Sequence, residues 1–179
     1  MRPAVLTLLL ATSVPIGLWA QAIPFSQHAT VSQRVGITDL LITWNRPVAR
    51  GRILFGDEGL VKWGQTWNPG ADSATRIAIS RDVEIEGRPV PRGEYTLWLV
   101  PAMQGPWTLI LNRQSHIYHT PYPGAEDDLF RVSVEPARGD HMEVLAWYFP
   151  VVARDTAVLR MHWGETVVPV RIRTFLDPP

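Results

Sequence analysis

The chain has 179 residues with 17 basic and 17 acidic side chains, so its formal net charge is zero. This balance lacks the basic excess through which proteins bind nucleic-acid phosphates. The chain contains no cysteine, which excludes disulfides, thiol nucleophiles, thiolate metal sites and a lipid-modified cysteine after a leader. We therefore expect a core that is held together by packing alone.

The first 22 residues differ in composition from the rest. Arg2 precedes the apolar run AVLTLLLATSV, and Ala20-Gln21-Ala22 has the pattern of a signal-peptidase site. Pro15 and the short apolar run disfavour an uncleaved membrane anchor. Cleavage after Ala22 would remove Arg2 and no acidic residue, which leaves a net charge of about −1. We expect residues 1–22 to be a signal peptide and residues 23–179 to form one periplasmic or secreted domain without a membrane span.

Short segments with the composition of strands alternate with turn signals along the chain. They are 37–44, 51–55, 75–79, 83–85, 95–100, 107–111, 129–134, 143–149, 157–163 and 166–173. Segment 25–34 is polar and weakly patterned, 87–93 is a Pro- and Gly-rich connection, and 57–74 and 112–128 are irregular. No segment has sustained helical periodicity. The pattern predicts an all-β fold, an antiparallel β-sandwich or flattened barrel of roughly ten short strands with little helix.

The C-terminal segments allow more specific predictions. Residues 136–140 have the composition of a turn, and Gly164-Glu165 has the Gly-X form of a two-residue type II′ hairpin. Pro169 indicates an edge position or a bulge in the last strand. Period-2 alternation places His162 on the outward face. It places the following residues on the core face: Ala157, Leu159, Met161, Trp163, Val168, Val170 and Ile172.

An ordered set of residues carries a family resemblance. It comprises Arg46-Pro47, Arg50-Gly51-Arg52, Phe55-Gly56, Trp63-Gly64, Trp67, Gly70-Ala71, Val83, Gly87, Gly93-Glu94-Tyr95-Thr96-Leu97, Pro101, Trp107 and the late segment AVLRMHWGETVVPVRI. The set resembles the bacterial, mostly exported family called domain of unknown function 2911. The resemblance implies a fold and an exported location but no established activity. It also implies W-R-x-G-A-N-E-A-T in the central loop, where this chain has Asn68, Asp72 and Ser73 in place of Arg, Asn and Glu. A family function that depended on those side chains would be lost or altered here.

The central loop supplies the first candidate site. Candidate ligand-binding residues are Arg46, Arg52, Trp63, Trp67 and Asp72. Exposed Trp rings can stack on sugar rings, and paired Arg side chains can clamp a carboxylate or phosphate. The alternative is structural, with the Trp rings in the core and the Arg side chains, including Arg50, paired with Asp57, Glu58 or Asp72. Trp44, at the end of a strand, is expected in the core.

The loop 112–128 supplies a second, weaker candidate. His116, His119 and Asp127, with Glu126 and Asp128 beside them, include the ligand types of an open zinc site. The spacing SHIYH is not the helical HExxH motif, however, and chance co-occurrence in a polar loop is the competing interpretation.

Motifs for nucleophilic catalysis are missing. The chain has no G-x-S-x-G elbow and no phosphate-binding Gly loop, although a pair of catalytic carboxylates would leave no sequence signature. The sequence therefore favours a non-enzymatic binding module for an envelope glycan or peptide, without a cofactor. The alternatives are a metal-assisted hydrolase using His116, His119 and Asp127, and an envelope-assembly protein that docks through a sheet edge.

Overall fold

The computed structural model describes residues 25–176, so the predicted signal peptide 1–22 lies outside the described residues. Ten strands and one short 3-10 helix follow one another along the chain. They are β1 Gln27–Val35, β2 Thr38–Arg46, β3 Arg76–Ile79, β4 Val83–Ile85, β5 Arg88–Val90, β6 Gly93–Val100, β7 Trp107–Asn112, η1 Ala125–Asp127, β8 Asp128–Val134, β9 Ala137–Val152 and β10 Thr156–Thr174. No helix in this range is long and apolar enough to cross a membrane.

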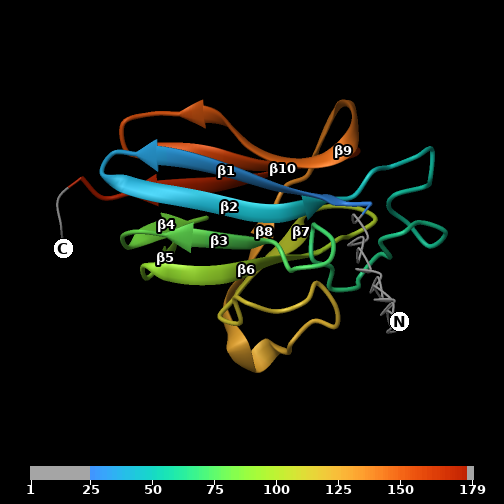
Figure 1. The fold of residues 1–179 in the computed structure, drawn as a ribbon, viewed down its shortest axis with the longest axis horizontal. Coiled ribbons are helices and arrows are strands. Elements are labelled where there is room, and N and C mark those ends of the chain that lie inside the picture. Colours follow the sequence, from blue (N-terminus) through green and yellow to red (C-terminus); the bar gives the residue numbers. More distant parts are fainter. Residues whose placement is uncertain (1–24, 177–179) are drawn as a thin grey trace, which may run out of the picture.

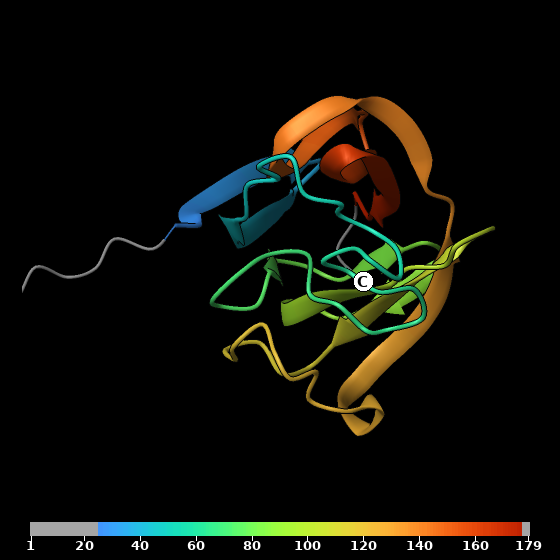
Figure 2. The same ribbon diagram turned by 90° about the vertical axis from the view of Figure 1, so that its right-hand side faces the viewer.

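Two antiparallel sheets pack face to face (Figures 1 and 2). The six-stranded sheet has the order β1-β2-β3-β6-β7-β8, and the four-stranded sheet has the order β5-β4-β10-β9. The predicted antiparallel β-sandwich is confirmed, and its sheets do not close into a barrel. Long connections extend from the strands, and Figure 1 shows the segment after β2 at the right-hand end and the segment after β7 below β6.

The core lies between the inward faces of the two sheets. Alternate residues of β2, such as Leu40 and Ile42, are fully buried while Leu41 is exposed. All the residues predicted for the core face of the C-terminal segments are buried. Period-2 alternation identified this face because successive side chains of a strand point to opposite sides of the sheet.

Some strand assignments from the sequence are wrong. Segment 51–55 is not a strand, and only Phe55 makes an isolated bridge, with Val61. The polar segment 27–35 is β1, and the connection 87–93 contains β5. Both missed strands lie at sheet edges, where one neighbouring strand and one buried face leave little hydrophobic signal. The turn predicted at 136–140 is also wrong, because β9 begins at Ala137.

The predicted hairpin at Gly164-Glu165 is wrong, because β10 runs without a turn from Thr156 to Thr174. Gly164 has φ 58° and lies at register shifts between β10 and β9, so it forms a bulge instead of a chain reversal. Pro169 lies between Val167, the last residue paired with β9, and Ile172, the first paired with β4. Because Pro169 is paired with neither strand, its lack of an N–H group removes no hydrogen bond from the sheet.

His162 is on the face opposite the core, as predicted, but it is not exposed. Only 7% of its surface is accessible, because the bent β9 covers it. Its Nδ1 lies 3.2 Å from the Tyr148 hydroxyl and its Nε2 lies 2.9 Å from the Asp140 carbonyl oxygen. Period-2 alternation predicts which face of the sheet a side chain is on. It does not predict whether another segment of the chain covers that face.

Candidate functional site

The segment after β2 packs an aromatic cluster against one end of the core. Phe55 lies at its centre, with ring centroids 6.5 Å from Trp63, 5.7 Å from Trp67, 5.2 Å from Trp107 and 6.1 Å from Trp163. Trp67 also stacks on Trp163 at 6.0 Å. The backbone of Trp67 bridges to Leu99 of β6, which anchors the segment to the six-stranded sheet. Packing of this kind explains how a long irregular connection keeps a fixed shape.

The two candidate Trp side chains in this segment are partly buried and pack against the core. Trp63 lines a shallow surface hollow of about 430 Å³ with Trp107 and Met103. Trp44 is 5% exposed, and its indole donates a hydrogen bond to the Leu145 carbonyl at 3.2 Å. The expectation that Trp44 belongs to the core is confirmed.

The candidate Arg side chains bind backbone carbonyls. Arg46 Nε donates to Leu145 O at 3.2 Å, and Arg52 donates to Ala49 O and Val48 O. Among the described residues no ion pair joins Arg46, Arg50 or Arg52 to an acidic side chain. These contacts fix the turn that follows β2, in place of the predicted ion pairs.

Among the described residues Asp72 forms no ion pair with those arginines. Its Oδ2 accepts a hydrogen bond from Asn45 Nδ2 at 3.0 Å, and its carbonyl accepts from the His119 amide. None of the surface cavities described here is lined by more than one of the five candidate residues. The structure therefore does not bring them together as one binding wall.

His116, His119 and Asp127 have separate partners. His116 contacts Glu94 and Arg76, the His119 ring contacts Tyr118, and Asp127 accepts from Gln114. Within residues 25–176 no group of three or more His, Cys, Asp or Glu side chains could hold a metal ion. In the described structure these three side chains therefore do not converge on one point, because proximity in sequence does not by itself bring side chains together.

The segment after β7 covers the outer face of the six-stranded sheet. Trp98 and Ile110 pair across β6 and β7 on that face, and both are buried beneath Ile117 and Tyr122. Trp98 contacts Tyr122 edge-to-face at 5.2 Å. The segment after β7 thus buries two large apolar residues that lie outside the main core.

A polar network fixes the far end of this segment. Asp128 accepts hydrogen bonds from the Tyr122 hydroxyl, from Asn112 Nδ2 at 2.9 Å and from Arg131 Nε at 2.7 Å. Burial and the Asp128 hydrogen bond raise the pKa of Tyr122. The hydrogen bond to Asp128 raises the pKa of Arg131 in the same network. Because the buried carboxylate is fully paired, the segment has a defined anchor.

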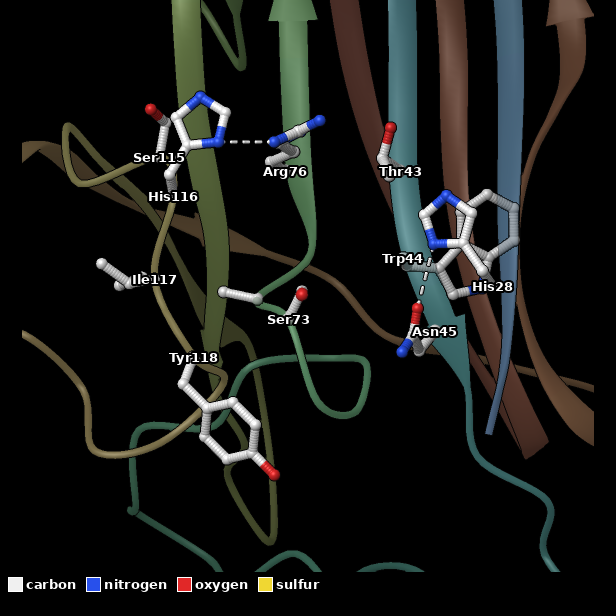
Figure 3. A pocket seen from close by; sticks show the side chains of 11 residues that line it. His28, Thr43, Trp44, Asn45, Ser73, Arg76, Ser115, His116, Ile117 and Tyr118 are labelled. Carbon is white, nitrogen blue, oxygen red and sulfur yellow. Dashed lines mark hydrogen bonds between the residues drawn. The ribbon is translucent and has the colours of Figure 1, made fainter. Parts of the chain in front are cut away.

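A groove lies between this segment and β2, and we call it the outer-sheet groove (Figure 3). Its volume is about 300 Å³. Its floor is formed by side chains of β2 and β3, one wall by residues 115–118, and the other by β1. Its lining includes the polar and aromatic side chains of His28, Asn45, Ser73, Arg76, His116 and Tyr118.

One wall of the groove carries a chain of charged and polar groups. His116 Nε2 lies 2.9 Å from Glu94 Oε2, and His116 Nδ1 lies 2.7 Å from Arg76 Nη1. The guanidinium can only donate, so Nδ1 is the acceptor and Nε2 carries the proton that goes to Glu94. Figure 3 shows His116 and Arg76 joined above Ser73 and Tyr118.

The opposite wall has a similar chain. Asn45 donates to Asp72 through Nδ2, so its Oδ1 accepts from His28 Nδ1 at 3.0 Å. Tyr118 lines the groove and has 56% of its surface exposed. The groove therefore presents donors, acceptors and one accessible aromatic ring.

A family model matches residues 26–172, which include every residue of the groove and of the aromatic cluster. The chain belongs to the family described as Protein of unknown function (DUF2911). Searches of the curated proteins and of the solved structures return no match. The family resemblance noted from the ordered residue set is therefore confirmed.

Asn68, Asp72 and Ser73, which differ from the central-loop pattern that the family resemblance implies, have different surroundings. Asn68 is buried and bonded to Leu97 O and the Thr75 amide, so it supports the loop. Asp72 holds Asn45, and Ser73 lines the groove. Two of the three DUF2911 departures thus lie at the outer-sheet groove.

Most groove residues were not identified from the sequence, which gave only His116 and the supporting Asp72. The available signal was the polar residues Thr43 and Asn45, which alternate with buried residues at the end of β2. Those positions mark the outward face of a strand. Their approach to Tyr118 depends on a loop more than sixty positions away.

Proposed function

We propose that this member of the DUF2911 family is an exported, non-enzymatic binding module whose outer-sheet groove takes a small glycan of the cell envelope. The observation that carries the proposal is the exposed Tyr118 ring beside fixed donors and acceptors in one concave site. A sugar has hydroxyls that both donate and accept and an apolar ring face, so it complements both features. Binding sites of this kind combine apolar surface with a few convergent polar groups.

The hydrogen-bonding state of His116 supports binding over hydrolysis. A general base needs a free ring nitrogen within reach of the hydroxyl that it deprotonates. Both nitrogens of His116 are occupied, one by Glu94 and the other by Arg76. Ser73 and Ser115 line the same groove, but in the described part of the chain no hydrogen bond links either hydroxyl to His116. For the metal-assisted alternative, residues 25–176 contain no group of three or more His, Cys, Asp or Glu side chains that could hold an ion.

The test is a titration of the processed protein with soluble envelope-type oligosaccharides, followed by NMR or calorimetry. We expect saturable binding with amide shifts at Ser73, Arg76 and Tyr118. Tyr118→Ala should weaken binding about tenfold, which corresponds to about 1.4 kcal/mol. Phe175→Ala is the matched control, because Phe175 is a partly exposed aromatic residue that does not line the groove.

The outcomes separate the alternatives. If Tyr118→Ala and Phe175→Ala weakened glycan binding equally, Tyr118 would have no specific role in binding the ligand. Saturable binding of short peptides without any glycan binding would make the ligand a peptide, and the glycan assignment would be wrong. Release of a hydrolysed product during the titration would contradict the non-enzymatic role.

A further inference from the structure

A second cavity lies on the other layer of the sandwich, on the outer face of the four-stranded sheet. It has a volume of about 540 Å³ and lies along β9 and β10, which run side by side in Figure 1. Its lining includes Asp140, Met142, Tyr148, Arg160 and His162. It shares no lining residue with the outer-sheet groove.

Arg160 is the distinctive side chain of this cavity. It lies directly opposite Tyr148 on the neighbouring strand, so the two side chains share a face. Its Nε is buried, and no protein atom in residues 25–176 accepts a hydrogen bond from it. The same part of the chain offers the guanidinium no ion pair. Buried donors are normally paired. The buried Nε is out of reach of a molecule in the cavity, so the terminal N–H groups of Arg160 are the donors that a ligand can contact.

The other basic side chains of the cavity have acidic partners. Arg138 pairs with Glu165 at 2.7 Å, and His141 contacts Glu143 at 2.9 Å. Arg138 is 81% exposed at its side chain, so its pair contributes little to a buried site. Among the described residues, Arg160 is therefore the arginine of this cavity that forms no ion pair.

His162 and Tyr148 do not compete with Arg160 as donors to a ligand. The Asp140 carbonyl can only accept, so His162 Nε2 carries the proton and Nδ1 accepts from the Tyr148 hydroxyl. Both hydrogens are used within the protein. The N–H groups of Arg160 remain to bind a ligand, and Met142, Val167 and Pro169 supply apolar surface beside them.

We propose that this cavity binds the carboxylate of a small organic acid or of a peptide C-terminus, with Arg160 as the carboxylate-binding residue. A guanidinium matches a carboxylate with two parallel hydrogen bonds. Asp140 lines the same cavity and disfavours anions of higher charge, such as phosphate. The apolar side chains beside Arg160 favour a carboxylate that carries a short apolar group.

The experiment is an NMR titration of the processed protein with hexanoate, inorganic phosphate and sodium chloride at constant ionic strength. We expect hexanoate to give saturable shifts at amides of β9 and β10 around Arg160, with weaker effects from phosphate and none from chloride. A tripeptide with a free C-terminus, compared with its amidated form, distinguishes a peptide source from a free acid. Saturable binding of hexanoate or of the free tripeptide supports the proposal, and equal binding of the amidated tripeptide overturns it.

Matched variants make the test specific. Arg160→Gln should weaken hexanoate binding at least tenfold, and Arg160→Lys should retain part of it. Arg173→Gln is the control, because Arg173 pairs with Glu84 outside this cavity, and it should change hexanoate binding less than twofold. Near-UV circular dichroism checks that each variant is folded. Equal losses for Arg160→Gln and Arg173→Gln, tighter binding of phosphate than of hexanoate, or no saturable shift in the wild type would overturn the proposal.

Discussion

The roles of most histidines in this protein depend on the hydrogen-bond partners of their ring nitrogens. His116 and His28 each use a ring nitrogen to hold one wall of the outer-sheet groove, while His162 fixes Tyr148 on the opposite layer. The same residue type therefore serves three separate hydrogen-bond chains. His119 differs from these, because its ring contacts Tyr118 and is partly buried.

The partial burial of His119 predicts a pH dependence of stability. Desolvation lowers its pKa below the ordinary value of 6.5, and the charge of Asp72 opposes part of this effect. A histidine with a depressed pKa in the folded state stabilises the protein above its unfolded pKa, and this contribution is lost as the pH falls through the folded pKa. We expect the free energy of unfolding to fall between about pH 7 and about pH 5.

Urea denaturation across this range measures the effect. The His119→Gln variant should have a shallower decline than the wild type, because glutamine does not titrate. Identical slopes for the two proteins would mean that His119 does not contribute to the pH dependence.

The Trp side chains predict a fluorescence result. Trp63 lines a surface hollow, whereas Trp67 stacks on Trp163 within the aromatic cluster. We therefore expect iodide to quench a smaller fraction of the fluorescence in Trp63→Phe than in the wild type. Trp67→Phe should change that fraction less. A quenchable fraction that neither substitution lowers would show that the whole cluster is closed to solvent and would exclude Trp63 as a ligand contact.

At the scale of secondary structure, β10 is the element that deviates most from its sequence pattern. Its 19 residues pair with β9 first and with β4 later, with a bulge at Gly164. The bulge lets a long strand remain continuous while its neighbour β9 bends over His162. Glycine at this position therefore marks a change of register and not the end of a strand.

Gly164→Ala tests the bulge. An added Cβ would lie 2.7 Å from Leu54 Cδ1, and alanine would have to adopt φ 58°. We expect a loss of about 1–3 kcal/mol in the free energy of unfolding, the usual range for such strain. Gly105→Ala is the control, since Gly105 also has a positive φ of 74° but nothing lies within 4 Å of its added Cβ. Equal losses for the two variants would show that contact with Leu54 has no effect.

At the scale of the whole molecule, the fold is held by one core between two sheets, without disulfides. The outer-sheet groove and the cavity lined by Arg160 lie on different layers and share no lining residue. The two proposed binding roles can therefore be tested by independent substitutions.

The proposed export of this protein predicts a defined N-terminus. The Ala20-Gln21-Ala22 pattern leads us to expect cleavage after Ala22, so that the exported protein begins at Ile23. Intact mass spectrometry of the protein recovered from the periplasm or the medium of a bacterial host measures this. Recovery of the uncleaved chain in the membrane fraction would contradict both the cleavage and the soluble exported state.

The sequence by itself determined the all-β class, most of the strands and the core face of β10, and it left the sandwich and the flattened barrel as alternatives. These follow from alternation, which is a local property of a strand, so Leu159 and Val170 could be placed without knowing their neighbours. The ordered residue set likewise led to the family before any geometry was known. Strands at the sheet edges escaped this reasoning because their burial pattern is weak.

Only the tertiary structure decided which polar side chains meet. Arg46, Trp67 and Asp72 are near in sequence but have separate partners, whereas Arg76 and His116 are forty positions apart and share a hydrogen bond. Sheet order and the paths of the long loops determine such encounters, and both depend on how the whole chain packs. The hydrogen-bond partners of a polar side chain are therefore set by contacts distant in sequence, which no local pattern contains.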